Sequence, residues 1–221
     1  MSKLKQVLKN NGINPRGLDL LLGSGREAIH GLVADGASAI ELSRRLRLAA
    51  GEIGYWPLIM GSDDDLDRHG GSLLSSLECE RGSSRDLISL AARIDVPRWL
   101  AERAPDRGDL PAAGHWPAGE HANHHFTLPT DIVTGKPLQR VHIGLVPTVI
   151  EWQVPAFLHF GGWNDCPAPE YHVAMLKYWR HEYGAEVVGM SADTLELAVS
   201  RPPRDRAAAL LGGSAWFFWW D

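Results

Sequence analysis

The spacing of apolar side chains along the chain predicts helices and strands that alternate from end to end. Helical spacing over 37–50 and 168–183 is the clearest, and further helices are expected over 3–10, 84–92, from Pro97 and over 203–211. Strands are expected where apolar runs or alternation lie between turn residues, at 28–33, 55–60, 141–145, 186–190, 195–199 and 216–220. Residues 152–160 fit either a strand or a short helix. This mixture predicts an α/β (α+β) fold with a mixed central sheet and flanking helices.

The chain shows no internal repeat and no clean domain boundary, so residues 1–221 are expected to form a single domain. Residues 141–221 are expected to supply most of the core, with the helix at 168–183 packed on the carboxyl-terminal strands. Residues 1–140 are less regular. The stretch 61–83 is acidic and rich in Gly and Ser, with a short helix expected near 73–77. The stretch 105–137 is rich in Pro, Gly and His and predicts a long loop.

Composition and charge narrow the function classes. The chain is 44% hydrophobic and 22% charged, with a net charge of −5 and no Lys/Arg cluster, which argues against a nucleic-acid partner. No apolar run approaches the roughly 20 residues of a membrane span, and the first residues lack a signal-peptide apolar core. Cys79 and Cys166 lie far apart and are expected to be free thiols. We therefore expect a cytoplasmic protein with no membrane partner.

Tryptophan is the compositional outlier, with nine residues. Large aromatic side chains bury much area each, so this excess indicates a heavily aromatic core. An aromatic binding cleft is the alternative.

The strongest candidate site is the turn Gly161-Gly162-Trp163-Asn164-Asp165-Cys166-Pro167, taken together with His172. Two glycines let the backbone approach a ligand closely, which makes Gly161, Gly162, Trp163 and Asn164 candidate ligand-binding residues. A Cys at the start of a helix has its thiolate stabilised, so Cys166 is a candidate nucleophile with His172 as its base and Asp165 as a third candidate catalytic residue.

The same turn also fits a purely structural role. Asn164 or Asp165 would then cap the following helix, and Cys166 would pack as a small apolar side chain. His172 would lie on a buried stripe with Met175, Leu176 and Trp179. Cys166 and His172 are about one and a half helical turns apart, so they share a helix face only if the chain bends at Pro167 or Pro169.

Two further clusters are weaker candidates. His115, His121, His124 and His125, with Glu120, have the donor atoms for Zn²⁺ but no recognised ligand spacing, so a polar surface loop is favoured and neither a metal nor a cofactor is expected. Asp63, Asp65 and Asp67 match the first positions of a calcium loop. Arg68 stands where that loop needs glycine and Leu74 where it needs glutamate, so a solvated acidic turn is expected instead.

The carboxyl-terminal half carries a family resemblance. The segments that carry it are 152–158, Phe160-Gly161-Gly162-Trp163-Asn164-Asp165-Cys166-Pro167, 183–188, Leu195-Glu196-Leu197, Arg201-Pro202-Pro203 and Trp216-Phe217-Phe218-Trp219-Trp220-Asp221. They resemble the bacterial family of domain of unknown function 4253, and Gly54-Tyr55-Trp56-Pro57-Leu58 resembles the amino-terminal part of actinobacterial members. The resemblance implies an α/β fold, and the family has no established activity to carry over.

One departure from the family bears on function. Members of the family have a further segment with a Cys-Pro-Asp sequence before the last strand, whereas Ala207 to Leu211 here run almost directly into Gly212-Gly213. If that segment helped to build a site, this chain would be an inactive relative.

Two functional hypotheses follow. The first is a non-catalytic binding module that recognises a protein or a small ligand through the Gly161–Cys166 turn. The second is a small hydrolase or transferase that uses Cys166 and His172.

Overall fold

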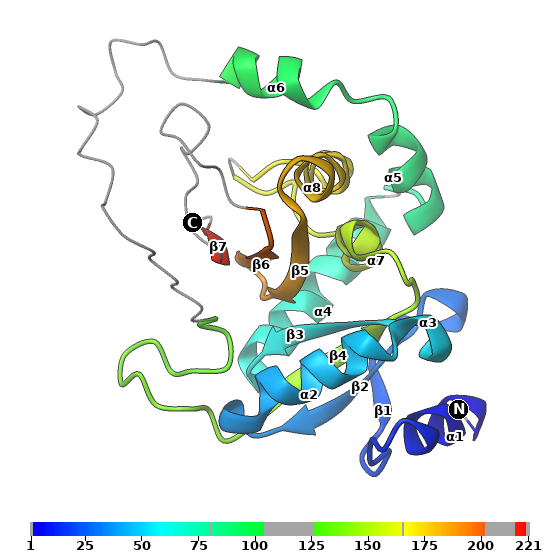
Figure 1. The fold of residues 1–221 in the computed structure, drawn as a ribbon. Helices are drawn as coiled ribbons and strands as arrows, with labels where there is room; N and C mark the ends of the chain where they lie inside the picture. The colour runs from blue at the N-terminus through cyan, green and yellow to red at the C-terminus, as the bar shows by residue number, and fades with distance from the viewer. Residues whose placement is uncertain (1, 80, 104–125, 165, 202–214, 220–221) are drawn as a thin grey trace.

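The computed structural model describes residues 2–79, 81–103, 126–164, 166–201 and 215–219. The strands of these residues form one sheet in the order β1-β2-β4-β3-β5-β6-β7 (Figure 1). Their bounds are β1 Asp19–Leu22, β2 Ile29–Ala34, β3 Trp56–Gly61, β4 Val141–Val146, β5 Ala185–Met190, β6 Thr194–Val199 and β7 Ala215–Trp219. β3 and β5 are parallel and the other neighbours are antiparallel, so the sheet is mixed.

Helices connect the strands and lie against the sheet. They are α1 Ser2–Asn10, α2 Gly36–Leu48, α3 Ala50–Ile53, α4 Asp63–Glu78, α5 Ser84–Ala91, α6 Val96–Arg103, α7 Val154–Leu158 and α8 Pro169–Tyr183, with short 3₁₀ helices η1 Gly25–Glu27 and η2 Glu151–Gln153. The expected mixed α/β fold with flanking helices is confirmed. None of the described helices is long and apolar enough to cross a membrane.

Two hydrophobic layers lie on opposite faces of the sheet. Along β3, Leu58 and Met60 belong to one layer and Ile59 to the other, because successive strand side chains point to opposite faces. The first layer is covered by α4, α5, α7 and α8, and the second by α1, α2 and α3. Every residue of β3 and β4 is buried, in keeping with their apolar sequences.

The helix α4 corrects the expectation for residues 61–83. A short helix at 73–77 and a solvated acidic turn at Asp63–Asp67 were expected, but one helix covers both. Ser62 and Asp65 form a reciprocal capping box at its start, and acidic side chains suit the positive end of a helix dipole. His69, Leu73 and Ser76 are buried at helical spacing, so packing outweighs the helix-breaking effect of the two central glycines.

Other expected elements also differ from the structure or lie partly outside its described residues. The segment 152–160 is helical rather than extended, as η2 and α7. The cap of α5 is Ser83 and not Ser84. Of the expected long loop, only 126–137 lies among the described residues, where an isolated bridge joins Thr130 and Pro137. The expected helix at 203–211 lies outside them.

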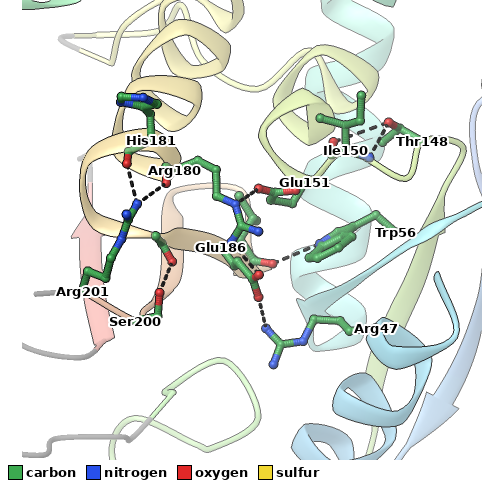
Figure 2. A network of polar contacts seen from close by, with 12 residues as sticks. Arg47, Trp56, Thr148, Ile150, Glu151, Arg180, His181, Glu186, Ser200 and Arg201 are labelled. Atoms are coloured by element: carbon green, nitrogen blue, oxygen red, sulfur yellow. Dashed lines mark hydrogen bonds and ion pairs between the residues drawn. The ribbon is translucent and has the colours of Figure 1, made fainter. Parts of the chain in front are cut away.

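An ion network joins the two helical layers at the start of β5 (Figure 2). The Glu186 carboxylate accepts from Arg180 of α8 at 2.5 Å and from Arg47 of α2 at 3.3 Å. Arg180 also contacts the buried Glu151 at 3.1 Å. Beside them, the Trp56 indole donates to the carbonyl oxygen of Val187 at 3.1 Å. Charged side chains therefore link helices from the two sides of the sheet through one carboxylate.

Candidate functional site

The turn that the sequence singles out connects α7 to α8, and its backbone is largely left-handed. His159 ends α7 with φ 50°, and Gly161, Gly162 and Asn164 have φ of 105°, 85° and 45°. The N–H of Gly162 donates to the carbonyl oxygen of Pro167 at 2.9 Å, and that of Cys166 to Trp163 at 2.8 Å. The turn is thus closed on itself by its own hydrogen bonds.

Both glycines of the turn are required by close contacts as well as by their φ angles. A Cβ on Gly161 would stand 2.0 Å from the carbonyl oxygen of Pro167, and one on Gly162 would stand 2.3 Å from Nη1 of Arg81. The backbone contact at 161 leaves no room for a side chain, so only glycine there allows the turn to close. A side chain at 162 would displace the end of Arg81 from the turn.

Arg81 binds the turn from a distant part of the sequence. Its Nη1 donates to the carbonyl oxygen of Gly161 at 2.9 Å and its Nη2 to that of Gly162 at 3.2 Å. The backbone N–H of Arg81 donates to Ser76 of α4 at 3.3 Å. Arg81 therefore fixes the Gly161–Gly162 turn against the carboxyl-terminal end of α4.

A pocket of about 300 Å³ lies between the turn and α4. It is lined by Gly71, Ser72, Ser75 and Ser76 of α4, by Arg81, by His159, and by Gly161, Gly162 and Trp163 of the turn. Trp163 is half-buried and meets Phe160 edge to face, with ring centroids 5.1 Å apart. The pocket thus combines hydroxyls, a guanidinium, an imidazole and an indole.

His159 is a buried polar group of this pocket. Its Nδ1 lies 2.8 Å from Oγ of Ser76, which joins the end of α7 to α4. Burial lowers the pKa of His159, and Arg81 lowers it further while Glu27 raises it. The imidazole is therefore neutral near pH 7 and can donate or accept a hydrogen bond.

Cys166 and His172 lie beneath the turn and in contact. The Sγ of Cys166 is 3.4 Å from Nε2 of His172, and both side chains are buried. Burial raises the pKa of the Cys166 thiol to about 12 and lowers that of His172 to about 4. Both groups are therefore neutral near pH 7, which is unlike an activated cysteine nucleophile.

The approach of Cys166 to His172 depends on where the helix begins. Ala168 is the N-cap of α8 and has no side-chain capping bond, so Cys166 precedes the helix and the chain bends before Pro169. The expectation that Asn164 or Asp165 caps this helix is wrong for this reason. His172 is buried with Met175, Leu176 and Trp179, as the stripe pattern predicts.

The other predicted site residues differ in where the structure places them. Gly161, Gly162 and Trp163 line the pocket, whereas Asn164 is exposed. Asp165 lies outside the described residues, as do Glu120 and the four histidines from His115 to His125. Within the described ranges, no group of three or more His, Cys, Asp or Glu side chains is placed to hold a metal ion. Both cysteines are free, as expected.

No sequence pattern identified Arg81, His159 or the serines of α4. None of them belongs to a recognised motif, and the pocket joins segments that are 80 residues apart. The αL position of His159 also leaves no sequence signature, because such positions usually carry glycine or asparagine.

Residues 142–211 match the family model of the domain of unknown function DUF4253. The predicted resemblance is confirmed for that segment, which is about one third of the chain. Neither a curated protein nor a solved structure matches.

The DUF4253 segment holds only one wall of the pocket. It includes His159 and the Gly161–Trp163 turn, whereas α4 and Arg81 precede it in sequence. The place expected for the family's Cys-Pro-Asp segment, among residues 202–214, lies outside the described part of the chain.

Proposed function

We propose that this protein is a non-catalytic binding module that recognises a small ligand through the Gly161–Cys166 turn and the pocket beside it. The observation that carries the proposal is the pocket itself, which places Trp163, Arg81 and His159 around a volume of about 300 Å³. Small-molecule sites combine an apolar wall with a few fixed polar groups, and this volume is at the small end of their range.

The fixed geometry of the turn supports a binding role. Gly161 and Gly162 are held by Arg81 and by the hydrogen bonds that close the turn, so a ligand would meet a preformed surface. A preformed site loses less conformational entropy on binding than a mobile one. Two free thiols also fit a reducing compartment, and we infer a cytoplasmic location from them.

The experiment follows the indole signal of Trp163 by NMR during a screen of small polar compounds. A compound that binds the pocket should shift that signal, and the Trp163→Ala variant should lose the binding while the protein stays folded. Trp99→Ala is the matched control, because Trp99 stacks on Tyr171 away from the pocket. If Trp163→Ala binds every hit as well as the wild type does, the pocket is not the site. Retention of a protein from lysate by the wild type, without small-molecule binding, would favour a protein partner instead.

A second candidate function rests on the 3.4 Å contact between Cys166 and His172. A small hydrolase or transferase would need His172 to take the thiol proton of Cys166, and the burial of both groups opposes that charge separation. The test is turnover of a simple activated ester or thioester. Loss of turnover in a stable Cys166→Ala variant would favour the enzyme, and unchanged turnover would eliminate Cys166 as nucleophile.

A further inference from the structure

We propose that the ligand of this pocket is a small organic anion, with a carboxylate or phosphate group bound by Arg81 and a compact apolar body placed against Trp163. This inference rests on the binding function proposed above and specifies its ligand class. It is carried by the charge, the remaining hydrogen-bonding capacity and the shape of the pocket wall.

The lining of the pocket carries positive charge and no described carboxylate. The other residues that line the pocket with Arg81 are serines, glycines, His159 and Trp163, and none of them is Asp or Glu. No described carboxylate lies within ion-pair distance of Arg81. Glu27, which acts on His159 electrostatically, is held instead by the backbone N–H and hydroxyl of Ser84 at 3.1 and 2.5 Å. Among the described residues, the guanidinium therefore has no negative partner at the pocket wall.

Arg81 has donors left for a ligand. A guanidinium has five N–H groups, and the carbonyl oxygens of Gly161 and Gly162 take one each. Because these two bonds fix the plane of the group, the remaining donors are already oriented. A fixed guanidinium suits the paired oxygens of a carboxylate or phosphate better than a neutral amide.

Hydroxyl groups of α4 add further donors beside Arg81. Ser72 and Ser75 lie three positions apart on the helix, and their side chains make no hydrogen bond to another described residue. Ser76 is engaged with His159 and is buried. Ser72 and Ser75 are thus the serines that can turn toward an anion.

The indole of Trp163 provides the apolar part of the wall. Its edge-to-face contact with Phe160, at an interplanar angle of 85°, fixes the ring on one side. A small volume next to one indole fits a compact flat or aliphatic body rather than a large cofactor.

A competing explanation gives Arg81 a structural role only. A cation just after the carboxyl-terminal end of α4 is favoured by the helix dipole, and Arg81 also holds the turn. The two explanations differ in one respect: only the ligand-binding role makes the pocket discriminate between charged and neutral compounds of equal shape.

The experiment therefore uses benzoate and its neutral analogue benzamide as probes, with binding followed by calorimetry and by the Trp163 indole signal. We expect the wild type to bind benzoate at least about tenfold more tightly than benzamide, the size expected for a charged hydrogen bond. Arg81→Gln should lose this preference. Arg85→Gln is the matched control, because Arg85 is exposed on α5 and does not line the pocket.

A second variant is needed because Arg81→Gln also removes the two hydrogen bonds that hold the turn. Ser75→Ala leaves both Arg81 bonds to the turn in place and should weaken benzoate more than benzamide. Phenyl phosphate, compared with benzoate, then tells a phosphate site from a carboxylate site.

The outcomes separate this inference from the proposed function. If benzamide shifts the Trp163 signal and binds as tightly as benzoate, the pocket binds ligands but the anion inference is overturned. An equal loss in Arg81→Gln and Arg85→Gln would also overturn it, because a general charge effect would then explain the preference. If neither probe shifts the signal at millimolar concentration, the anion inference fails, whereas the small-ligand function fails only if the whole compound screen gives no binding.

Discussion

Gly161 lies directly on the imidazole of His172, since a Cβ at Gly161 would stand 2.9 Å from both Cδ2 and Nε2 of that ring. The ring in turn contacts Cys166 through Nε2 at 3.4 Å and Phe160 edge to face. The pocket turn therefore rests on a buried Cys–His pair and is held from the other side by Arg81. In this arrangement the pair supports the turn, and the groups that face the pocket are different ones.

The first prediction concerns the space above His172. Gly161→Ala should destabilise the fold by about 3 kcal/mol, because it combines a positive φ with a Cβ that has no room. Gly17→Ala is the matched control: Gly17 has φ 76° and nothing within 4 Å of its Cβ position, so only the backbone cost of about 1 kcal/mol is expected. Urea denaturation of both variants measures the difference. Equal losses would show that the turn can move away from His172.

The fold was largely predictable because its central strands have simple patterns. The apolar run of β3 and the alternation around Val141 identify buried strands, and Gly184 marks the end of α8. The helix α4 was underestimated because five glycine and serine positions between residues 70 and 76 oppose a helix locally. Burial of Leu73 and His69 against the rest of the protein is a tertiary effect that no local pattern shows.

The candidate site was only half predictable. The double glycine identified the turn, but Arg81 comes from a segment 80 residues away and carries no motif. The contact between Cys166 and His172 depends on α8 beginning at Pro169, a boundary that sequence patterns fix poorly. A single sequence does not show which individual residues, far apart in the chain, come into contact in the fold.

The second prediction concerns the two thiols. With the pKa of Cys166 near 12, only about 10⁻⁴ of this thiol is ionised at pH 8, and the side chain is also buried. Alkylation of Cys166 in a Cys79→Ser background should therefore be slow until the protein unfolds. The exposed Cys79, measured in a Cys166→Ser background, should react readily. A Cys166 that reacts as fast as Cys79 in the folded protein would instead support the nucleophile hypothesis.

The third prediction concerns acid stability. The folded pKa of His172, about 4, lies below the value of about 6.5 for an unfolded histidine, so the unfolded state takes up the proton first. The contribution of His172 to stability is thus complete above about pH 6.5 and is lost as the pH falls toward 4, by up to about 3 kcal/mol. Glu151 and Glu196 have raised pKa values and act in the opposite direction.

The effect of His172 on stability in acid is measured by comparing the wild type with variants. The free energy of unfolding is measured from pH 7 to 4 for the wild type and for His172→Gln, which keeps the carboxylates and the other histidines. His172→Gln should be less stable at pH 7 but should fall less steeply with acid. His181→Gln, at an exposed position of α8, should keep the wild-type slope. Identical slopes in all three proteins would mean that His172 is not buried as a neutral ring.

The fourth prediction concerns the ion network of Figure 2. Glu186→Gln should cost about 1–2 kcal/mol, because it leaves Arg47 without its partner at 23% side-chain exposure and removes one partner of Arg180. Glu41→Gln is the comparison, since its pair with Arg44 is more than half exposed on α2 and should contribute less than about 0.5 kcal/mol. Urea denaturation at low salt and at about 0.5 M salt separates the two cases, because salt screens the exposed pair more strongly. If both variants lose the same small amount, Glu186 does not tie the two helical layers together, and their association must rest on the hydrophobic layers alone.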